Sequence, residues 1–186
     1  MFSYHPFSEE CTKALNEVVA YHLHTSHVYL AMVHNFKSDD ETYPFVSYFE
    51  TLADSRREYA DKFLQHLWTR NKKICPPIYE KVDMKEITTP IKAILLAQKM
   101  EVTLTSILRG LKAVARRESD LLTFLASVLR KQGTNEDFMK SQLTQLQKTE
   151  KKREKGPQTE NPSTSSGAEG FNLRSKKSKL ELTKPE

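Results

Sequence analysis

Apolar stripes along three stretches of the chain are interrupted by polar side chains that could form hydrogen bonds, ion pairs or metal contacts. Seven-residue steps give four such sets: Leu15, His22, Tyr29 and Phe36; Phe45, Leu52, Tyr59 and His66; Phe49, Arg56, Phe63 and Arg70; Ile94, Glu101, Leu108 and Ala115. A charge on a buried face costs free energy unless a partner compensates it. A guanidinium fits a carboxylate, so we predict that Arg56 and Glu101 form a buried ion pair. Further hydrogen bonds are expected from His22, Tyr29 and Tyr59.

This polar cluster has two interpretations, a self-satisfied structural network and a metal or acid–base site. A single carboxylate beside an arginine makes a poor cation site, because the guanidinium repels the metal and occupies its ligand. We therefore favour the structural interpretation. Outside the cluster, His24 and His27 are three residues apart and could hold a divalent metal, although most such histidines are simply surface residues.

A second group of candidate ligands is acidic. Asp54, Glu58 and Asp61 follow i, i+4, i+7 spacing, which places them on one face of a helix beside its apolar stripe. With Arg57 and Lys62 nearby, a solvated charged face is the simpler interpretation. The functional alternative is a weak site for hard or ferric cations.

The elements that would position these residues are helices, and the predicted fold class is an all-α four-helix bundle. Ser8, Thr42 and Thr89 can cap helices, and proline occupies the first turn of the second and third. Few glycines and few β-branched runs argue against a sheet. The predicted helices span residues 9–36, 43–71, 90–118 and 119 to about 150.

Two features govern how these helices connect. Residues 72–89 contain adjacent prolines, which forbid a helix, and the segment is long enough to cross a whole bundle. We therefore predict that the second and third helices run parallel. In the fourth helix, Gly133-Thr134-Asn135 is expected to cause a kink or an interruption.

Charge and composition divide the chain into a helical domain over residues 1–155 and a disordered basic tail over residues 156–186. The net charge is +5, of which residues 148–186 carry +4 (ten Lys/Arg against six Asp/Glu), so the body is nearly neutral. The basic tail is therefore no reason to assign a nucleic-acid-binding domain. Two cysteines without metal or redox spacing, no signal-peptide pattern and no long apolar run predict a reduced cytoplasmic protein without a membrane span.

Several segments of the chain resemble ferritin subunits, in consistent order and spacing over about residues 8–130. Residues 26–32 and 36–40 resemble the end of the family's first helix and the following turn. Tyr48-Phe49 and residues 57–62 resemble the second helix, and residues 98–101 with Leu108 and Leu111 resemble the third. The resemblance implies a ferritin-like bundle with a long crossover between helices two and three.

Transferred position by position, the resemblance implies a lost di-iron site. The family's first-helix glutamate falls on His22, and its second-helix glutamate and histidine fall on Arg56 and Tyr59. The third-helix glutamate is kept as Glu101 and the site tyrosine as Tyr29. The fourth-helix glutamine falls near Gly133, without a firm alignment. This pattern is similar to ferritin light chains, in which a salt bridge replaces the metals.

Other family features are only partly kept. Asp54, Glu58 and Asp61 match part of the light-chain surface where mineral nucleates, but Thr51 and Ser55 occupy two of its other positions. Thr123 and Ala126 stand where the family's iron channel carries acids. Lys176, Lys177 and Lys179 replace apolar residues expected in the short last helix.

The resemblance thus implies a light-type or accessory ferritin-like cage subunit for intracellular iron storage and iron homeostasis, without ferroxidase activity. Iron would be a stored mineral and not a catalytic cofactor, and the partners would be further copies or heavy-type ferritin subunits in a cage. One alternative is a degenerate ferritin fold that serves as a structural or interaction protein without an iron role. Another is a nuclear or nucleic-acid-associated protein, through the basic run at residues 174–179.

Overall fold

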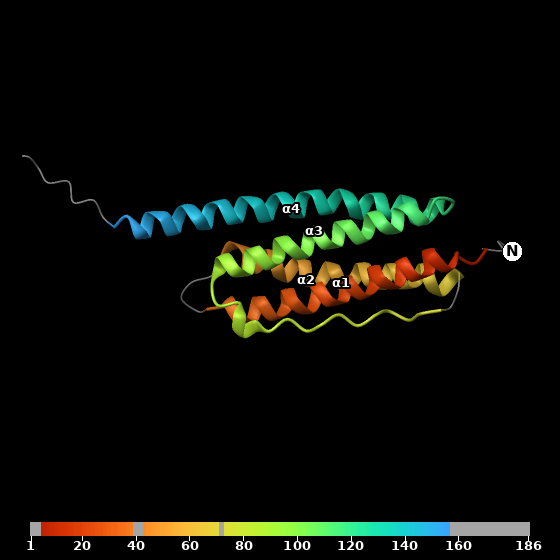
Figure 1. Cartoon of the computed structure of the whole chain (residues 1–186), viewed down its shortest axis with the longest axis horizontal. Helices are drawn as coiled ribbons and strands as arrows, with labels where there is room; N and C mark the ends of the chain where they lie inside the picture. Colours follow the sequence, from red (N-terminus) through yellow and green to blue (C-terminus); the bar gives the residue numbers. More distant parts are fainter. Residues whose placement is uncertain (1–4, 39–42, 71–72, 157–186) are drawn as a thin grey trace, which may run out of the picture. The chain divides into compact units, whose positions relative to one another are not determined.

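Four long helices lie side by side in the computed structural model of this protein, which describes residues 5–38, 43–70 and 73–156 (Figure 1). The chain divides into two units after Glu154, and the bundle belongs to the first. The helices are α1 (Glu9–Phe36), α2 (Pro44–Arg70), α3 (Pro90–Val114) and α4 (Ser119–Glu154), with a 3-10 turn η1 (Met84–Glu86) before α3. The described residues contain no strand, so the predicted all-α four-helix fold is confirmed.

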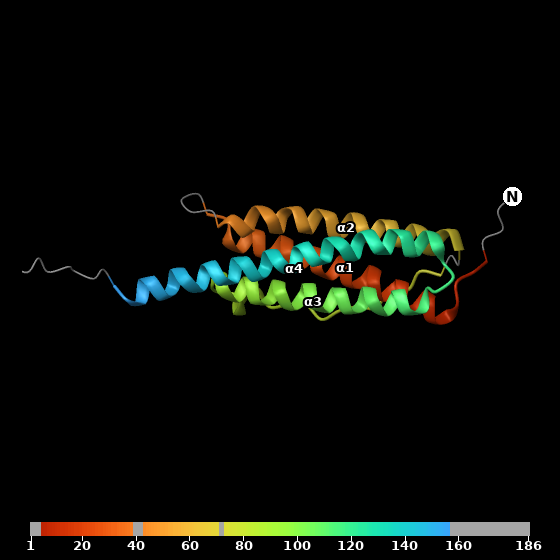
Figure 2. The ribbon, with the colours of Figure 1, turned by 90° about the horizontal axis from the view of Figure 1, so that it is seen from above.

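The helices form two antiparallel pairs, α1 with α2 and α3 with α4, and α1 also packs against α3. The chain travels in opposite directions through α1 and α2, then in the same direction through α2 and α3, as Figures 1 and 2 show. The predicted parallel arrangement of α2 and α3 is therefore confirmed. In this bundle, side chains from all four helices meet at one level of the core.

The crossover between α2 and α3 lies along α1 and is tied to it by side-chain amides. The backbone N–H of Cys75 donates to Oδ1 of Asn16 at 2.7 Å, and Nδ2 of Asn35 donates to the carbonyl of Ile87 at 2.9 Å. These two contacts hold the crossover against α1 near both of its ends. Between them the described crossover has no secondary structure beyond η1, and side chains of α1 satisfy some of its backbone polar groups.

The helix starts follow local chemistry. Ser8 Oγ accepts the backbone N–H of Cys11 at 3.1 Å, and Thr89 Oγ1 accepts that of Lys92 at 3.3 Å, so both predicted caps are present. The predicted cap Thr42, the expected last residue Asn71 of the second helix, and the tail from residue 157 lie outside the described residues.

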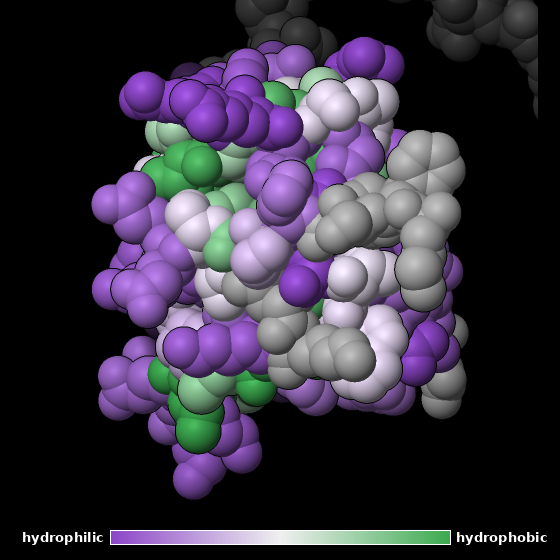
Figure 3. Space-filling model, turned by 90° about the vertical axis from the view of Figure 1, so that its right-hand side faces the viewer, coloured by the Kyte–Doolittle hydropathy of each residue, from purple (hydrophilic) through white to green (hydrophobic). Residues whose placement is uncertain are grey.

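Figure 3 shows one end of the bundle as a mostly hydrophilic surface with smaller hydrophobic patches. Arg70, the last residue of α2, makes tertiary contacts to the start of α4. Its guanidinium donates to Glu118 at 2.5 Å and to Asp120 at 3.1 Å, and it lies 4.8 Å from the centre of the Phe7 ring. The last turn of α2 is thereby joined to the α3–α4 connection. Among the described helices, none has the length and apolarity that a membrane crossing requires.

The end of α3 and the course of α4 differ from the sequence expectation. α3 ends at Val114, one turn before the expected Glu118, because the chain turns there towards α4, with the N–H of Glu118 bonded to the carbonyl of Ala115 at 3.0 Å. The expected interruption at Gly133 is wrong, since α4 is helical from Ser119 to Glu154. Gln132 and Asn135, on either side of Gly133, are buried and anchor this part of α4 to the core, which outweighs the weak helix propensity of one glycine.

Gly133 lowers the stability of α4, because glycine loses more backbone entropy than other residues on folding, and no close neighbour requires a residue without a side chain here. A Cβ at Gly133 would meet no atom within 4 Å. We expect Gly133→Ala to raise the free energy of unfolding by about 0.5–1 kcal/mol, because alanine has less backbone entropy to lose. Chemical denaturation followed by circular dichroism measures this. Gly110→Ala, equally open in α3, is the matched control and should behave alike; destabilisation at Gly133 alone would contradict the expectation.

Candidate functional site

A buried ion pair lies at the centre of the bundle. Nη2 of Arg56, from α2, lies 2.5 Å from Oε2 of Glu101, from α3, and the side chains are 1% and 0% exposed. The structure thus contains the pair predicted from the two apolar stripes. Full burial of both partners means that their charges are compensated by each other and by neighbouring protein groups.

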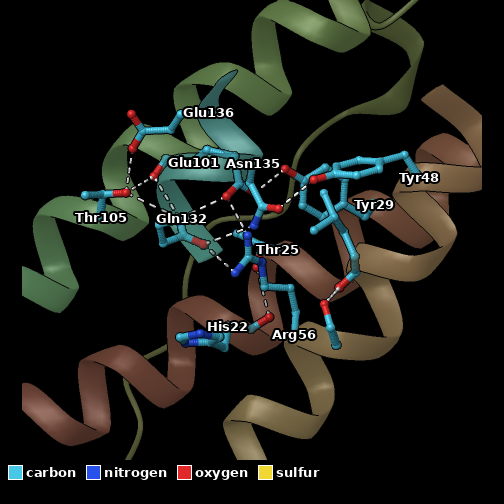
Figure 4. A network of polar contacts seen from close by, with 12 residues as sticks. His22, Thr25, Tyr29, Tyr48, Arg56, Glu101, Thr105, Gln132, Asn135 and Glu136 are labelled. Carbon is cyan, nitrogen blue, oxygen red and sulfur yellow. Dashed lines mark hydrogen bonds and ion pairs between the residues drawn. The ribbon is translucent and has the colours of Figure 1, made fainter. Parts of the chain in front are cut away.

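The remaining hydrogen-bonding capacity of Glu101 is filled from two further helices (Figure 4). Tyr29 of α1 donates its hydroxyl to Oε1 at 2.5 Å, and Gln132 of α4 donates Nε2 to Oε2 at 2.9 Å. Nη1 of Arg56 in turn donates to Oε1 of Gln132 at 2.8 Å. Arginine, glutamate and glutamine therefore form a closed triangle of hydrogen bonds, with a tyrosine on its free side.

An outer set of polar side chains extends this triangle. Asn135 donates Nδ2 to Oε1 of Gln132 at 3.4 Å and accepts the hydroxyl of Tyr48 at 2.6 Å. On the other side, Gln132 donates to Oγ1 of Thr105 at 3.3 Å, and Thr105 donates to Glu136 at 2.6 Å. The network thus joins all four helices and fixes their positions at this level of the core.

The electrostatics of the site favour fixed protonation states. Burial, followed by the charge of Glu101, raises the pKa of Tyr29 well above its ordinary value, so this hydroxyl stays protonated and acts as a donor. Burial, together with the neighbouring positive charge of Arg56, lowers the pKa of His22 to about 3. The site therefore holds a neutral phenol and a neutral imidazole beside one ion pair.

His22 lies beside the network without joining it, contrary to the expectation that it would hydrogen-bond to the pair. Nδ1 of His22 lies 2.7 Å from the carbonyl of Val18, one turn earlier in α1. The neutral ring donates its proton there, which leaves Nε2 as a bare acceptor. Within the described part of the chain, this Nε2 and Nε of Arg56 are the buried side-chain polar atoms without a hydrogen-bond partner.

Tyr59 also lies outside the network, although its sequence position suggested a partner for the pair. The residue is half-buried, with Nζ of Lys62 and of Lys131 5.7 Å and 5.6 Å from its ring centre. The reason is geometric: seven residues fall about 20° short of two full helical turns, so a seven-residue stripe drifts around a straight helix. The stripe containing Arg56 stays inside, while the neighbouring one has turned outward by Tyr59.

The acidic trio is on the surface. Asp54, Glu58 and Asp61 are all exposed on α2, and Gln65 donates Nε2 to Asp61 at 2.9 Å. Glu58 and Asp61 line a shallow concavity together with Arg57, Lys62 and Gln65. Over the described ranges, no three His, Cys, Asp or Glu side chains come close enough together to hold a metal ion.

Sequence reasoning missed the contribution of α4 to the site. Gln132 and Asn135 are 1% and 9% exposed, and neither was assigned a role. A usable signal was present in two seven-residue stripes. Leu125, Gln132 and Met139 form one stripe with a single polar residue, and Leu121, Val128, Asn135 and Gln142 form the next with two. The expected break at Gly133 hid this periodicity.

Chemically, the centre of the bundle is suited to structure and unsuited to cations. Both carboxylate oxygens of Glu101 already accept hydrogen bonds, and the nearest cationic group is the guanidinium of Arg56. The unpartnered Nε2 of His22 could serve as a metal ligand, but the positive charge of Arg56 acts on the same ring and disfavours a cation there. A di-iron centre needs several inward carboxylates, so the residues present do not fit one.

Comparison with known proteins identifies the family. The family model described as ferritin-like domain matches residues 12–149. Over 115 residues, which are 61% of its length, the chain is 30% identical to "Ferritin heavy chain" of Echinococcus granulosus. Over the same length it is 28% identical to "Ferritin, lower subunit" of Aquarana catesbeiana. It is 26% identical to "Ferritin, middle subunit" of Salmo salar. The matched part spans 65–66% of these relatives, just under two thirds of their length. With a family model matched over most of its length and the four-helix fold in place, the chain belongs to the ferritin family.

Proposed function

We propose that this protein is a light-type or accessory ferritin subunit, which contributes to iron storage in a cage without oxidising Fe(II). The observation that carries the proposal is the closed triangle of Arg56, Glu101 and Gln132 at the centre of the bundle. Where the resemblance implies a di-iron centre, a guanidinium occupies the carboxylate. Oxidation would then come from a heavy-type partner subunit, and iron is the cargo of the assembly.

The acidic trio supplies the surface on which this chain would meet stored iron. Asp54, Glu58 and Asp61 are exposed carboxylates, hard oxygen donors of the kind that ferric ions prefer. Their proposed role is to collect ions loosely at a surface and not to chelate one ion. That role is compatible with the absence of a three-ligand group within the described residues.

Aerobic oxidation of Fe(II) by the purified full chain tests the proposal. We expect the rate to match a buffer blank, because among the described residues Glu101 is the one buried carboxylate of the core, and two irons need several. The measurement is the absorbance of ferric product under air, with a heavy-type ferritin as the positive control. A clear rate above the blank, lost in Glu101→Gln, would refute the assignment.

The second candidate is a structural or interaction protein without an iron role, and the composition of the trio's surroundings favours it. Arg57 and Lys62 line the same concavity as Glu58 and Asp61, so the local charge is balanced and the attraction for cations is weak. The native particle mass separates the two candidates, measured for the chain alone and co-expressed with a heavy-type ferritin. A large hollow particle in either preparation supports storage; a monomer or dimer in both supports the second candidate.

A further inference from the structure

A pair of histidines lies on the side of α1 that is turned away from the ion pair. His24 follows the core residue His22 by two positions, which is about 200° around the helix. His24 is half-buried and His27, one turn later, is exposed. Both line a concavity of about 410 Å³ whose other walls are Ala20, Tyr79 and Lys81. Two imidazoles from adjacent turns thus open onto the same solvent-accessible space.

The ring of His24 is held in place by aromatic neighbours. Its centre lies 5.7 Å from that of Tyr21 in the same helix and 5.5 Å from that of Tyr79 in the crossover. The two tyrosine rings contact each other edge-on at 5.1 Å. The crossover therefore restricts the orientation of His24, so less conformational entropy is lost when that ring takes a ligand.

The nitrogen atoms of both rings are available for coordination. Across the described residues, neither His24 nor His27 takes part in a hydrogen bond. Burial, followed by the neighbouring His27, lowers the pKa of His24, so its ring is neutral and carries a lone pair at pH 7. A neutral imidazole is the form that binds metal ions.

We propose that His24 and His27 form a two-imidazole site for a divalent transition-metal ion of the borderline class, with Cu²⁺ preferred over Zn²⁺. Imidazole nitrogens suit these ions, and Cu²⁺ forms the most stable complexes of the divalent first-row series. In the described structure no third His, Cys, Asp or Glu joins the pair, so solvent supplies the other ligands. Hard ions such as Mg²⁺ and Ca²⁺ are not bound, because the pair offers no oxygen ligands.

Lys81 lowers the affinity of this site for metal cations. Lys81 lines the same concavity, and its positive charge repels a bound cation. The site is separate from the ion pair and from the acidic trio, and its occupancy does not depend on whether the protein stores iron. The histidine site and the iron-storage role can therefore be tested independently, and a negative result for one does not affect the other.

Titration of the full chain with CuCl₂ by isothermal titration calorimetry, with electron paramagnetic resonance of the bound ion, tests the proposal. We expect one Cu²⁺ per chain and nitrogen hyperfine structure from two imidazoles. His24→Ala and His27→Ala should each weaken binding at least about tenfold, since loss of even a supporting contact costs 10–100-fold at metal sites. Lys81→Ala should tighten binding, because it removes a like charge.

The matched control is His34→Ala, which removes an exposed histidine of the same helix outside the concavity. It should leave Cu²⁺ affinity unchanged. His27 is exposed, so its substitution tests the site without disturbing the fold, which circular dichroism verifies. The proposal is overturned if the His24→Ala/His27→Ala double variant binds Cu²⁺ as tightly as the parent, or if His34→Ala weakens binding as much as His27→Ala.

Discussion

Arg56→Ala should lower the free energy of unfolding by about 3 kcal/mol or more. The substitution leaves the carboxylate of Glu101 buried at 0% exposure without its counter-charge, and it also removes the donor to Oε1 of Gln132. An unpaired buried charge costs far more than an average hydrogen bond, which is why this single change is expected to rank among the most damaging in the chain. Chemical denaturation at fixed protein concentration, followed by circular dichroism, gives the value.

Two further variants make this expectation specific. Arg57→Ala removes an exposed arginine one residue later and should change stability by no more than about 0.5 kcal/mol. Arg56→Met/Glu101→Met removes both charges and keeps most of the volume, so it should recover part of the loss, while Tyr29 and Gln132 lose the Glu101 carboxylate as their partner. Equal stability of the Arg56 and Arg57 single variants would show that the pair contributes nothing, and a double variant worse than Arg56→Ala would show that stranded charge is not the cause.

Acid should destabilise the fold through His22, by about 2 kcal/mol between pH 7 and pH 5. In the folded protein the pKa of this ring is lowered to about 3, whereas an unfolded histidine titrates near its ordinary value of 6.5. Between these two values the unfolded chain binds the additional proton. Stability is therefore complete above about pH 6.5 and falls as the pH drops towards the folded pKa.

The test compares unfolding free energies at pH 7 and pH 5 in the parent and in His22→Leu. The variant removes the titrating group and keeps an apolar side chain of similar size, so its loss between the two pH values should be smaller by about 2 kcal/mol. Burial also lowers the pKa values of His24 and His66, but their contributions cancel in the comparison. Identical pH dependence in parent and variant would mean that His22 takes up its proton over the same pH range in the folded and unfolded states.

Features of this structure that depend on local interactions can be predicted from the sequence. The start of α1 after Ser8 and of α3 after Thr89 follows from local capping chemistry, and the sequence contains it. The Arg56–Glu101 pair follows from two opposite charges on two apolar stripes, because each can compensate the charge of the other. These features need no knowledge of the tertiary arrangement.

The remaining features depend on packing that local rules do not contain. The continuity of α4 through Gly133 is decided by the burial of Gln132 and Asn135 against the other helices. The outward rotation of Tyr59 comes from a drift of about 20° per seven residues around a straight helix, which a simple seven-residue pattern ignores. The ring of His22 bonds to the carbonyl of Val18 in its own helix, and the sequence pattern does not decide between such a local partner and a tertiary one.

The hydrogen bonds that reach Glu101 from α1, α2 and α4 also constrain how this core can change over generations or in redesign. Replacing Arg56 with glutamate as a first step towards a metal-binding centre would put two carboxylates side by side with no cation between them, and one would have to take up a proton. Each substitution of this kind therefore passes through a protein less stable than its predecessor. Coupled substitutions made one at a time can therefore arise only in an order in which every intermediate still folds.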